Sequence, residues 1–127
     1  MELKGTGVAL ITPFTADNQV DVPALERIVE YVIAGGVEFI VALGTTSEAP
    51  TLTKEEKQLV CNTIVRVNNK RVPLVIGIGG NNTQNVIDEI KHTQLDDFVA
   101  ILSVTPYYNK PSQAGMYAHF AAIAQAS

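Results

Sequence analysis

Four runs of apolar, largely β-branched residues divide the chain at regular intervals. They cover residues 8–12, 39–43, 72–78 and 98–104. Within each run the apolar residues follow one another and do not alternate with polar ones. This pattern is typical of strands that are buried on both faces of a parallel sheet, so it predicts four such strands.

A helical pattern follows each run. Apolar residues recur at helical spacing within residues 25–33, 59–67, 86–90 and 116–123. The first helix has Asp21 as a candidate N-cap, and the second opens with a T-x-x-E capping box from Thr53 to Glu56. The third helix starts near Asn82 and the fourth at Ser112. The sequence therefore predicts one helix after each strand.

The predicted order is strand then helix, repeated four times in units of about 30 residues. Two architectures share this order, a doubly wound open sheet and a (β/α)8 barrel. A barrel needs about 250 residues, so the 127 residues here would supply about four of its eight units. At this length we expect a single domain.

Composition narrows the class of protein. Hydrophobic residues make up 46% of the chain, which is typical of a folded domain and excludes global disorder. The net charge is −4 and no basic run is present, so we expect neither nucleic acid nor an anionic membrane as a partner. No apolar stretch reaches the roughly 18 residues of a membrane span, and the opening MELKGTG lacks the apolar region of a secretory signal. We expect a soluble, cytoplasmic protein.

Metal and thiol chemistry have little support in the sequence. Cys61 is the single cysteine, which excludes an intrachain disulfide and a C-x-x-C motif. It falls in the second predicted helix, where we expect a small buried residue and not a nucleophile. His92 and His119 fall in different predicted helices without an acidic partner at ligand spacing. We therefore predict no metal site, and we expect both histidines to pack between helices or lie at the surface.

Candidate chemistry lies in the loops after the predicted strands, because ligands bind at the carboxyl ends of parallel strands. These loops cover residues 12–14, 44–48, 79–82 and 105–111. The second reads Gly-Thr-Thr-Ser-Glu, and its glycine, hydroxyls and free backbone amides could hold a small carboxylate. The alternative is an ordinary turn capped by hydroxyl groups. The glycines before Asn82 do not complete a G-x-G-x-x-G dinucleotide motif.

Two adjacent tyrosines, Tyr107 and Tyr108, occupy the fourth loop. Their side chains must point in different directions, and each phenol can donate and accept a hydrogen bond. A phenol held near a threonine hydroxyl can pass a proton. The alternative is that one ring packs in the core while the other covers an interface.

Four segments resemble the dihydrodipicolinate synthase family of pyruvate-dependent class I aldolases and lyases. They are GVALITPF at 7–14, GTTSEA at 44–49, GIGGN at 77–81 and VTPYYNKPSQ at 104–113. The resemblance implies a (β/α)8 TIM barrel of which residues 1–127 are the amino-terminal half, and usually a homotetramer built from tight dimers. The double threonine and the YYNKP run favour the synthase branch. Relatives that cleave sialic acid or ketodeoxy sugar acids are the alternative.

In that family the synthase condenses pyruvate with aspartate semialdehyde on the route to lysine and diaminopimelate. A lysine forms a Schiff base with pyruvate, and the resulting enamine attacks the aldehyde. The resemblance implies that Thr45 links two tyrosines in a proton relay and that Tyr108 enters the site of a neighbouring subunit. It also implies that Thr46 binds the pyruvate carboxylate. We expect no cofactor.

Two features depart from the family pattern. Ser47 stands where the family usually has glycine, which matters if the backbone there has a positive φ. The resemblance also places the Schiff-base lysine on the sixth strand and the second relay tyrosine after the fifth, both beyond Ser127. None of the lysines present falls within a predicted strand. We therefore expect these 127 residues alone to lack the condensation activity.

The resemblance further implies a pocket for L-lysine, which feedback-inhibited members bind at the dimer interface. Here its positions are Ala49, Lys54, Lys57, Asn81, Asn85 and Tyr107. Inhibited members carry histidines at the positions of Lys54 and Lys57 and a glutamate at that of Asn85. The two ammonium groups would repel cationic L-lysine, and the neutral amide would not form the ion pair that a glutamate offers. We therefore predict weak or absent inhibition. The alternative is that both lysines are solvated first-turn residues without a regulatory role.

A different class of function stays open. Four βα units could form a non-catalytic half-barrel module that binds a small anion at Thr45 and Thr46, or that only dimerises. In either case we expect the first and fourth strands to form open edges with partly uncovered apolar faces.

Overall fold

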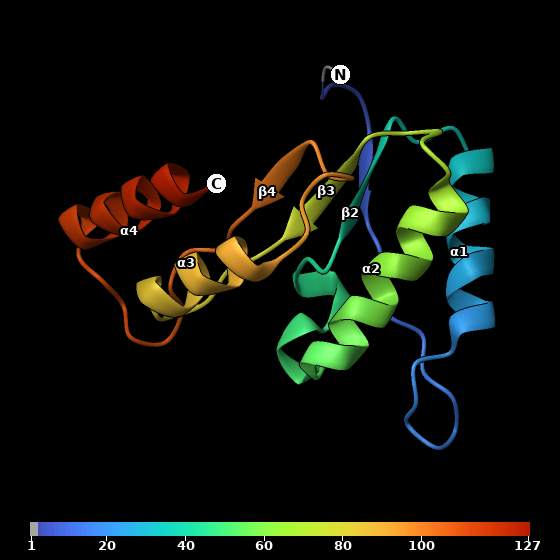
Figure 1. The fold of residues 1–127 in the computed structure, drawn as a ribbon, viewed down its shortest axis with the longest axis horizontal. Coiled ribbons are helices and arrows are strands. Elements are labelled where there is room, and N and C mark those ends of the chain that lie inside the picture. The colour runs from blue at the N-terminus through green and yellow to red at the C-terminus, as the bar shows by residue number, and fades with distance from the viewer. Residues whose placement is uncertain (1–2) are drawn as a thin grey trace.

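The computed structural model describes residues 3–127, which form one four-stranded parallel sheet with helices around it (Figure 1). The strands are β1 (Gly7–Ala9), β2 (Phe39–Ala42), β3 (Leu74–Gly77) and β4 (Ala100–Leu102). Each strand pairs in parallel with the next one along the chain, so the order across the sheet is β1-β2-β3-β4.

This order separates the two architectures that the sequence left open. A doubly wound sheet reverses at a switch point, so some strands that are consecutive in sequence are not neighbours. A (β/α)8 barrel instead adds each strand beside the previous one and keeps its helices outside. The described sheet follows the second rule. The chain therefore supplies the first four βα units of a barrel.

Four helices accompany the strands: α1 (Val22–Ala34), α2 (Lys54–Asn68), α3 (Thr83–His92) and α4 (Gln113–Ala126). All four start where the sequence predicts. The side chains of Asp21, Asn82 and Ser112 each accept a hydrogen bond from the backbone N–H three residues further on. Thr53 and Glu56 form the reciprocal capping box. These caps bind backbone N–H groups that no helical carbonyl can reach.

The outer strands correct the prediction that all four strands are buried on both faces. Ile40 in β2 and Ile76 in β3 are fully buried, whereas Leu102 in β4 is 52% exposed. Among residues 3–127, each outer strand has a strand partner on one side alone, which leaves its other edge open. The expectation of open edges is confirmed. The strands β1 and β4 are also shorter than the apolar segments 8–12 and 98–104 from which they were predicted.

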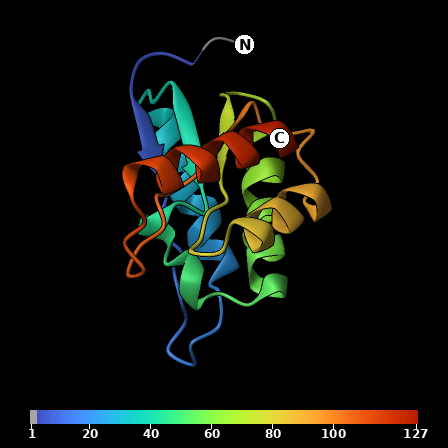
Figure 2. The ribbon, with the colours of Figure 1, turned by 90° about the vertical axis from the view of Figure 1, so that its left-hand side faces the viewer.

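The core lies between the sheet and the helices that cover it. Leu25 and Val29 of α1 and Ile64 of α2 are fully buried in it. Helix α1 packs against α2, and α3 packs against α4, so the helices form two pairs (Figure 1). Figure 2 views the molecule from the side of the second pair, with α4 in front. Between α3 and α4, the buried Nδ1 of His119 lies 2.8 Å from Thr83 Oγ1, which confirms a packing role for this histidine.

Residues 3–127 show no sign of a membrane-spanning helix or of a metal centre. Within that range no helix is both long and apolar enough to cross a membrane. The same residues contain no group of three or more histidine, cysteine or acidic side chains placed to hold a metal ion.

Candidate functional site

A cavity of about 620 Å³ lies at the carboxyl ends of β2, β3 and β4. The turn after β2, the segment after β3 and the loop after β4 form most of its wall. Its lining residues are Leu43, Gly44, Thr45, Ala49, Pro50, Lys57, Gly77, Ile78, Gly79, Glu89, Leu102, Ser103, Val104 and Tyr107. The cavity therefore lies where a barrel binds its substrate.

The turn after β2 has an unusual backbone. Residues Thr45–Ser47 form a short 3-10 turn, η1, which is followed by a second such turn, η2 (Ala49–Thr51). Leu43 and Glu48, on either side of η1, have positive φ angles of 53° and 59°. Ser47 itself is not in this left-handed region, so its replacement of glycine brings no backbone strain.

Two buried hydroxyl groups hold this turn. Ser47 Oγ donates a hydrogen bond to the carbonyl of Gly44 at 2.6 Å. Thr12 Oγ1, from the segment after β1, donates to the carbonyl of Ser47 at 2.8 Å. Thr45 and Thr46, which lie between these anchors, are exposed. The sequence placed Thr12 in the first candidate loop, at the end of an apolar run, but indicated no role for its hydroxyl.

The loop after β4 presents its two tyrosines differently. Tyr107 lines the cavity, whereas Tyr108 is 92% exposed and has a positive φ of 70°. Asn109 Nδ2 donates to the carbonyl of Asn81 at 3.2 Å, which links this loop to the one after β3. The structure thus brings Thr45 and Tyr107 to one cavity, and Tyr108 does not line that cavity of its own chain.

The predicted L-lysine pocket is divided in the structure. Ala49, Lys57 and Tyr107 line the cavity at the strand ends. Asn81 and Asn85 are exposed and lie outside it, and Lys54 lines a different cavity. Lys57 Nζ forms an ion pair with Glu89 Oε1 at 3.2 Å, across the gap between α2 and α3. Sequence reasoning did not anticipate Glu89.

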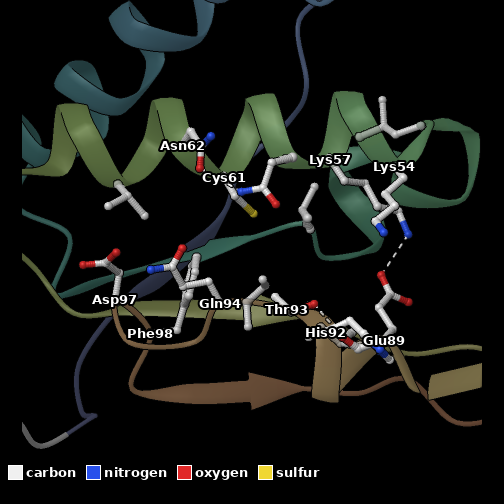
Figure 3. Close-up of a pocket in the computed structure, with 17 residues that line it drawn as sticks. Lys54, Lys57, Cys61, Asn62, Glu89, His92, Thr93, Gln94, Asp97 and Phe98 are labelled. Atoms are coloured by element: carbon white, nitrogen blue, oxygen red, sulfur yellow. Dashed lines mark hydrogen bonds and ion pairs between the residues drawn. The ribbon is translucent and has the colours of Figure 1, made fainter. Parts of the chain in front are cut away.

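The second cavity, of about 330 Å³, lies between α2 and the segment formed by α3 and the residues after it (Figure 3). The Lys57–Glu89 pair closes one end, and the sulfur of Cys61 points into the space. Burial raises the pKa of the Cys61 thiol to about 11, because a thiolate would lose its hydration there. The thiol is therefore protonated at neutral pH. This confirms the expectation of a small buried residue.

Comparison with known proteins identifies what the chain resembles. A sequence profile of the Dihydrodipicolinate synthetase family matches residues 2–127. The 4-hydroxy-tetrahydrodipicolinate synthase of Flavobacterium psychrophilum is 60% identical over 123 residues, which are 97% of this chain and 42% of that protein. The chain thus spans less than half the length of this curated relative.

Solved structures agree with the profile. The dihydrodipicolinate synthase of Acinetobacter baumannii, complexed with pyruvate, is 46% identical with a TM-score of 0.93, over 99% of this chain and 43% of that one. A prophage protein of the dihydrodipicolinic acid synthase family from E. coli K12, in complex with pyruvate, is 31% identical with a TM-score of 0.87. The match includes 97% of this chain and 41% of that protein. Both agree with the four-unit barrel segment described above.

Proposed function

Because the chain belongs to the dihydrodipicolinate synthetase family, we propose that the full-length protein is a 4-hydroxy-tetrahydrodipicolinate synthase. It condenses pyruvate with L-aspartate semialdehyde in the cytoplasm, on the biosynthetic route to lysine. The pyruvate bound in the A. baumannii and E. coli relatives supports pyruvate as the first substrate. Residues 1–127 belong to the single barrel domain that carries this activity.

One observation carries the proposal. The cavity at the carboxyl ends of the strands has Thr45 and Tyr107 in its wall, and Thr46 and Tyr108 are their immediate neighbours in the chain. Hydroxyl and phenol groups at the substrate end of a barrel suit a reaction that binds a carboxylate and moves several protons.

Each proposed residue has one chemical task. The hydroxyl and backbone N–H of Thr46 bind the pyruvate carboxylate. A lysine amine attacks the pyruvate carbonyl, water leaves to give the imine, and the methyl group then loses a proton to give the enamine that attacks the aldehyde. Thr45 passes protons between two tyrosines during these steps, because each of them needs a positioned acid or base.

The Schiff-base lysine comes from a later strand of the full-length protein. None of the lysines among residues 3–127 lies on a strand. Lys57 lines the cavity, but it belongs to α2 and is ion-paired with Glu89. Lys110 is exposed in the loop after β4. Without that later lysine, residues 1–127 do not perform the condensation.

The protein works as a homo-oligomer in which subunits share their sites. Tyr108 is almost fully exposed, and it follows a cavity residue in a loop that projects from the strand ends. In the proposed assembly its phenol enters the site of a neighbouring subunit and completes that subunit's relay through Thr45. The exposure of a large aromatic residue is in line with such an interface.

Borohydride trapping tests the proposal. The full-length protein is incubated with pyruvate and sodium borohydride, and the intact mass and peptide map are measured. We expect one covalent adduct on one lysine, and turnover with aspartate semialdehyde well above turnover with sugar aldehydes. Absence of an adduct would favour the non-catalytic module, and preference for a sugar aldehyde would favour the sialic acid or ketodeoxy sugar acid branch. Residues 1–127 expressed alone serve as the matched control and are expected to give no adduct.

A further inference from the structure

We propose that Thr12 and Ser47 are positioning residues that fix the Thr45–Thr46 turn in the geometry that binds the pyruvate carboxylate. This inference deepens the proposed function and rests on it. Neither side chain lines the cavity at the strand ends. Both act through the backbone of the turn, so their effect on the reaction is indirect.

The backbone of the turn is weakly held by itself. The N–H of Ser47 donates to the carbonyl of Gly44, and the N–H of Glu48 donates to that of Thr45, each at 3.0 Å. Short 3-10 turns have poorer hydrogen-bond geometry than α-helices. A three-residue turn with two exposed side chains therefore needs other contacts to keep one conformation.

Ser47 supplies the first of these contacts. Its hydroxyl donates to the same Gly44 carbonyl that accepts its backbone N–H, so two hydrogen bonds from one residue close the turn. The side chain is 1% exposed. Because a buried hydroxyl without a partner costs free energy, this bond holds whenever the turn is folded in this way.

Thr12 supplies the second contact, from the segment after β1. Its hydroxyl donates to the carbonyl of Ser47 across 35 residues of sequence, and its side chain is 4% exposed. The bond ties the end of the turn to the segment after β1. The carbonyls of Gly44 and Ser47, the residues that flank Thr45 and Thr46, thus each accept a hydrogen bond from a buried hydroxyl.

The ends of the turn show what these bonds oppose. Leu43 and Glu48 both have left-handed φ angles, which residues other than glycine adopt at a cost. Such a conformation persists when surrounding contacts hold it in place. Loss of the buried hydroxyl bonds would let the turn relax, and the exposed hydroxyls of Thr45 and Thr46 would move with it.

Substitutions that separate shape from hydrogen bonding test the role of Thr12. Thr12→Val keeps the shape of the side chain and removes its hydroxyl, whereas Thr12→Ser keeps the hydroxyl. In the full-length protein we expect Thr12→Val and Ser47→Ala each to raise the KM for pyruvate about fivefold, the equivalent of one hydrogen bond. We expect kcat to fall as well, because Thr45 of the relay moves with the turn, and Thr12→Ser to behave like the wild type. The double variant should raise KM by less than the product of the two, because both bonds act on one turn.

Thr63→Val is the matched control. Thr63 is also buried, and its Oγ1 donates to a backbone carbonyl, that of Leu59, at 2.8 Å. That bond lies within α2, away from the cavity at the strand ends. We expect Thr63→Val to lower the melting temperature without changing the KM for pyruvate.

The outcomes distinguish this inference from the proposed function. If Thr12→Val and Ser47→Ala lower the melting temperature but leave KM as it is in Thr63→Val, the two residues are structural and the inference is wrong. If Thr12→Ser raises KM as much as Thr12→Val does, the hydroxyl is not responsible and the inference is also wrong. A wild-type protein that gives no pyruvate adduct with borohydride instead overturns the proposed function itself.

Discussion

The two loops that carry the candidate site are held in opposite ways. The turn after β2 is fixed from inside the molecule, by buried hydroxyl groups of Thr12 and Ser47 that bond its backbone. The loop after β4 lies outside the packed core, and Tyr108 within it is almost fully exposed. One side-chain bond, from Asn109 to the carbonyl of Asn81, links this loop to the segment after β3.

This difference follows from the position of each strand. β2 has a partner on both sides and a buried surface beneath its end, so its turn is complete within these four units. β4 has its one described partner in β3, and the two tyrosines in the loop beyond it are exposed. We infer that substrate binding depends on contacts within the chain at the first loop, and on contacts between subunits at the second.

Gly77→Ala should produce the largest change, because it acts on the internally held turn. A methyl group at position 77 would lie 2.1 Å from the carbonyl oxygen of Leu43, which is backbone and cannot swing away. The residues from Leu43 onward would have to move. We expect the free energy of unfolding to fall by at least about 3 kcal/mol and the pyruvate adduct to be lost, as measured by denaturant titration and borohydride trapping.

Gly80→Ala is the matched control for that experiment. Position 80 lies three residues after position 77 in the same segment. A methyl group there would lie 3.6 Å from Val86 Cγ2, which is an ordinary van der Waals distance. Its stability should stay within about 0.5 kcal/mol of the wild type. Equal effects of the two substitutions would mean that the close packing of Leu43 over position 77 does not hold the turn.

Tyr108→Phe should produce the next largest change, and it acts on the exposed loop. The substitution removes the hydroxyl and keeps the ring, so a lost proton transfer would lower kcat about a hundredfold. The melting temperature should stay the same. Tyr117→Phe removes the hydroxyl of another largely exposed tyrosine, on α4, and should leave kcat unchanged. An unaltered kcat in Tyr108→Phe would remove this residue from the relay.

Mixed oligomers can show whether Tyr108 acts within its own chain or on a neighbour. We expect both Tyr108→Phe and Thr45→Val to be nearly inactive alone. In a dimer of one subunit of each kind, a tyrosine that crosses the interface leaves one site with intact Thr45 and Tyr108. Activity should then return to about half of the wild-type value. If both residues belong to one chain, every site keeps one defect and activity does not return.

The sequence predicted most of the fold because its signals are local. The caps at Asp21, Thr53, Asn82 and Ser112 act within one turn of helix, and the structure contains each of them. The apolar runs by themselves did not show the exposure of β1 and β4, which followed instead from counting four units and so leaving the first and fourth strands as open edges. An apolar run reads the same whether the strand is central or at an edge, and neighbouring strands decide which it is.

The site was less predictable, since its contacts join residues far apart in sequence. Thr12 and Ser47 are 35 positions apart, and Lys57 and Glu89 are 32 apart. No periodicity or motif spacing reports such pairs. The motifs at 44–49 and 104–113 did locate the two loops, because loops after parallel strands meet at one end of the sheet.

The dependence of stability on pH tests how completely the surroundings of Cys61 on α2 exclude water. The folded chain holds the Cys61 proton up to a pKa of about 11, while the unfolded chain loses it near 9.0. Between these values the unfolded state binds fewer protons, so stability falls as pH rises. We expect about 2 kcal/mol of loss between pH 8 and pH 11 from this group. Cys61→Ala should lack that part of the slope, and identical slopes in both proteins would mean that the thiol is hydrated.

The smallest effects are expected at the Lys57–Glu89 ion pair, which joins α2 to α3. Its side chains are 29% and 39% exposed, so water screens their attraction. Lys57→Gln should change the free energy of unfolding by less than about 1 kcal/mol.

The charges near this pair also bear on inhibition by L-lysine. Glu89 offsets the charge of Lys57. Lys54 still contributes a positive charge and Asn85 offers no negative one, which disfavours binding of cationic L-lysine. We expect millimolar L-lysine to leave the rate of the full-length enzyme nearly unchanged, and Asn85→Glu, which supplies a carboxylate, to increase inhibition. A low-micromolar inhibition constant for the wild type would show that the exposed loops bind L-lysine despite these charges.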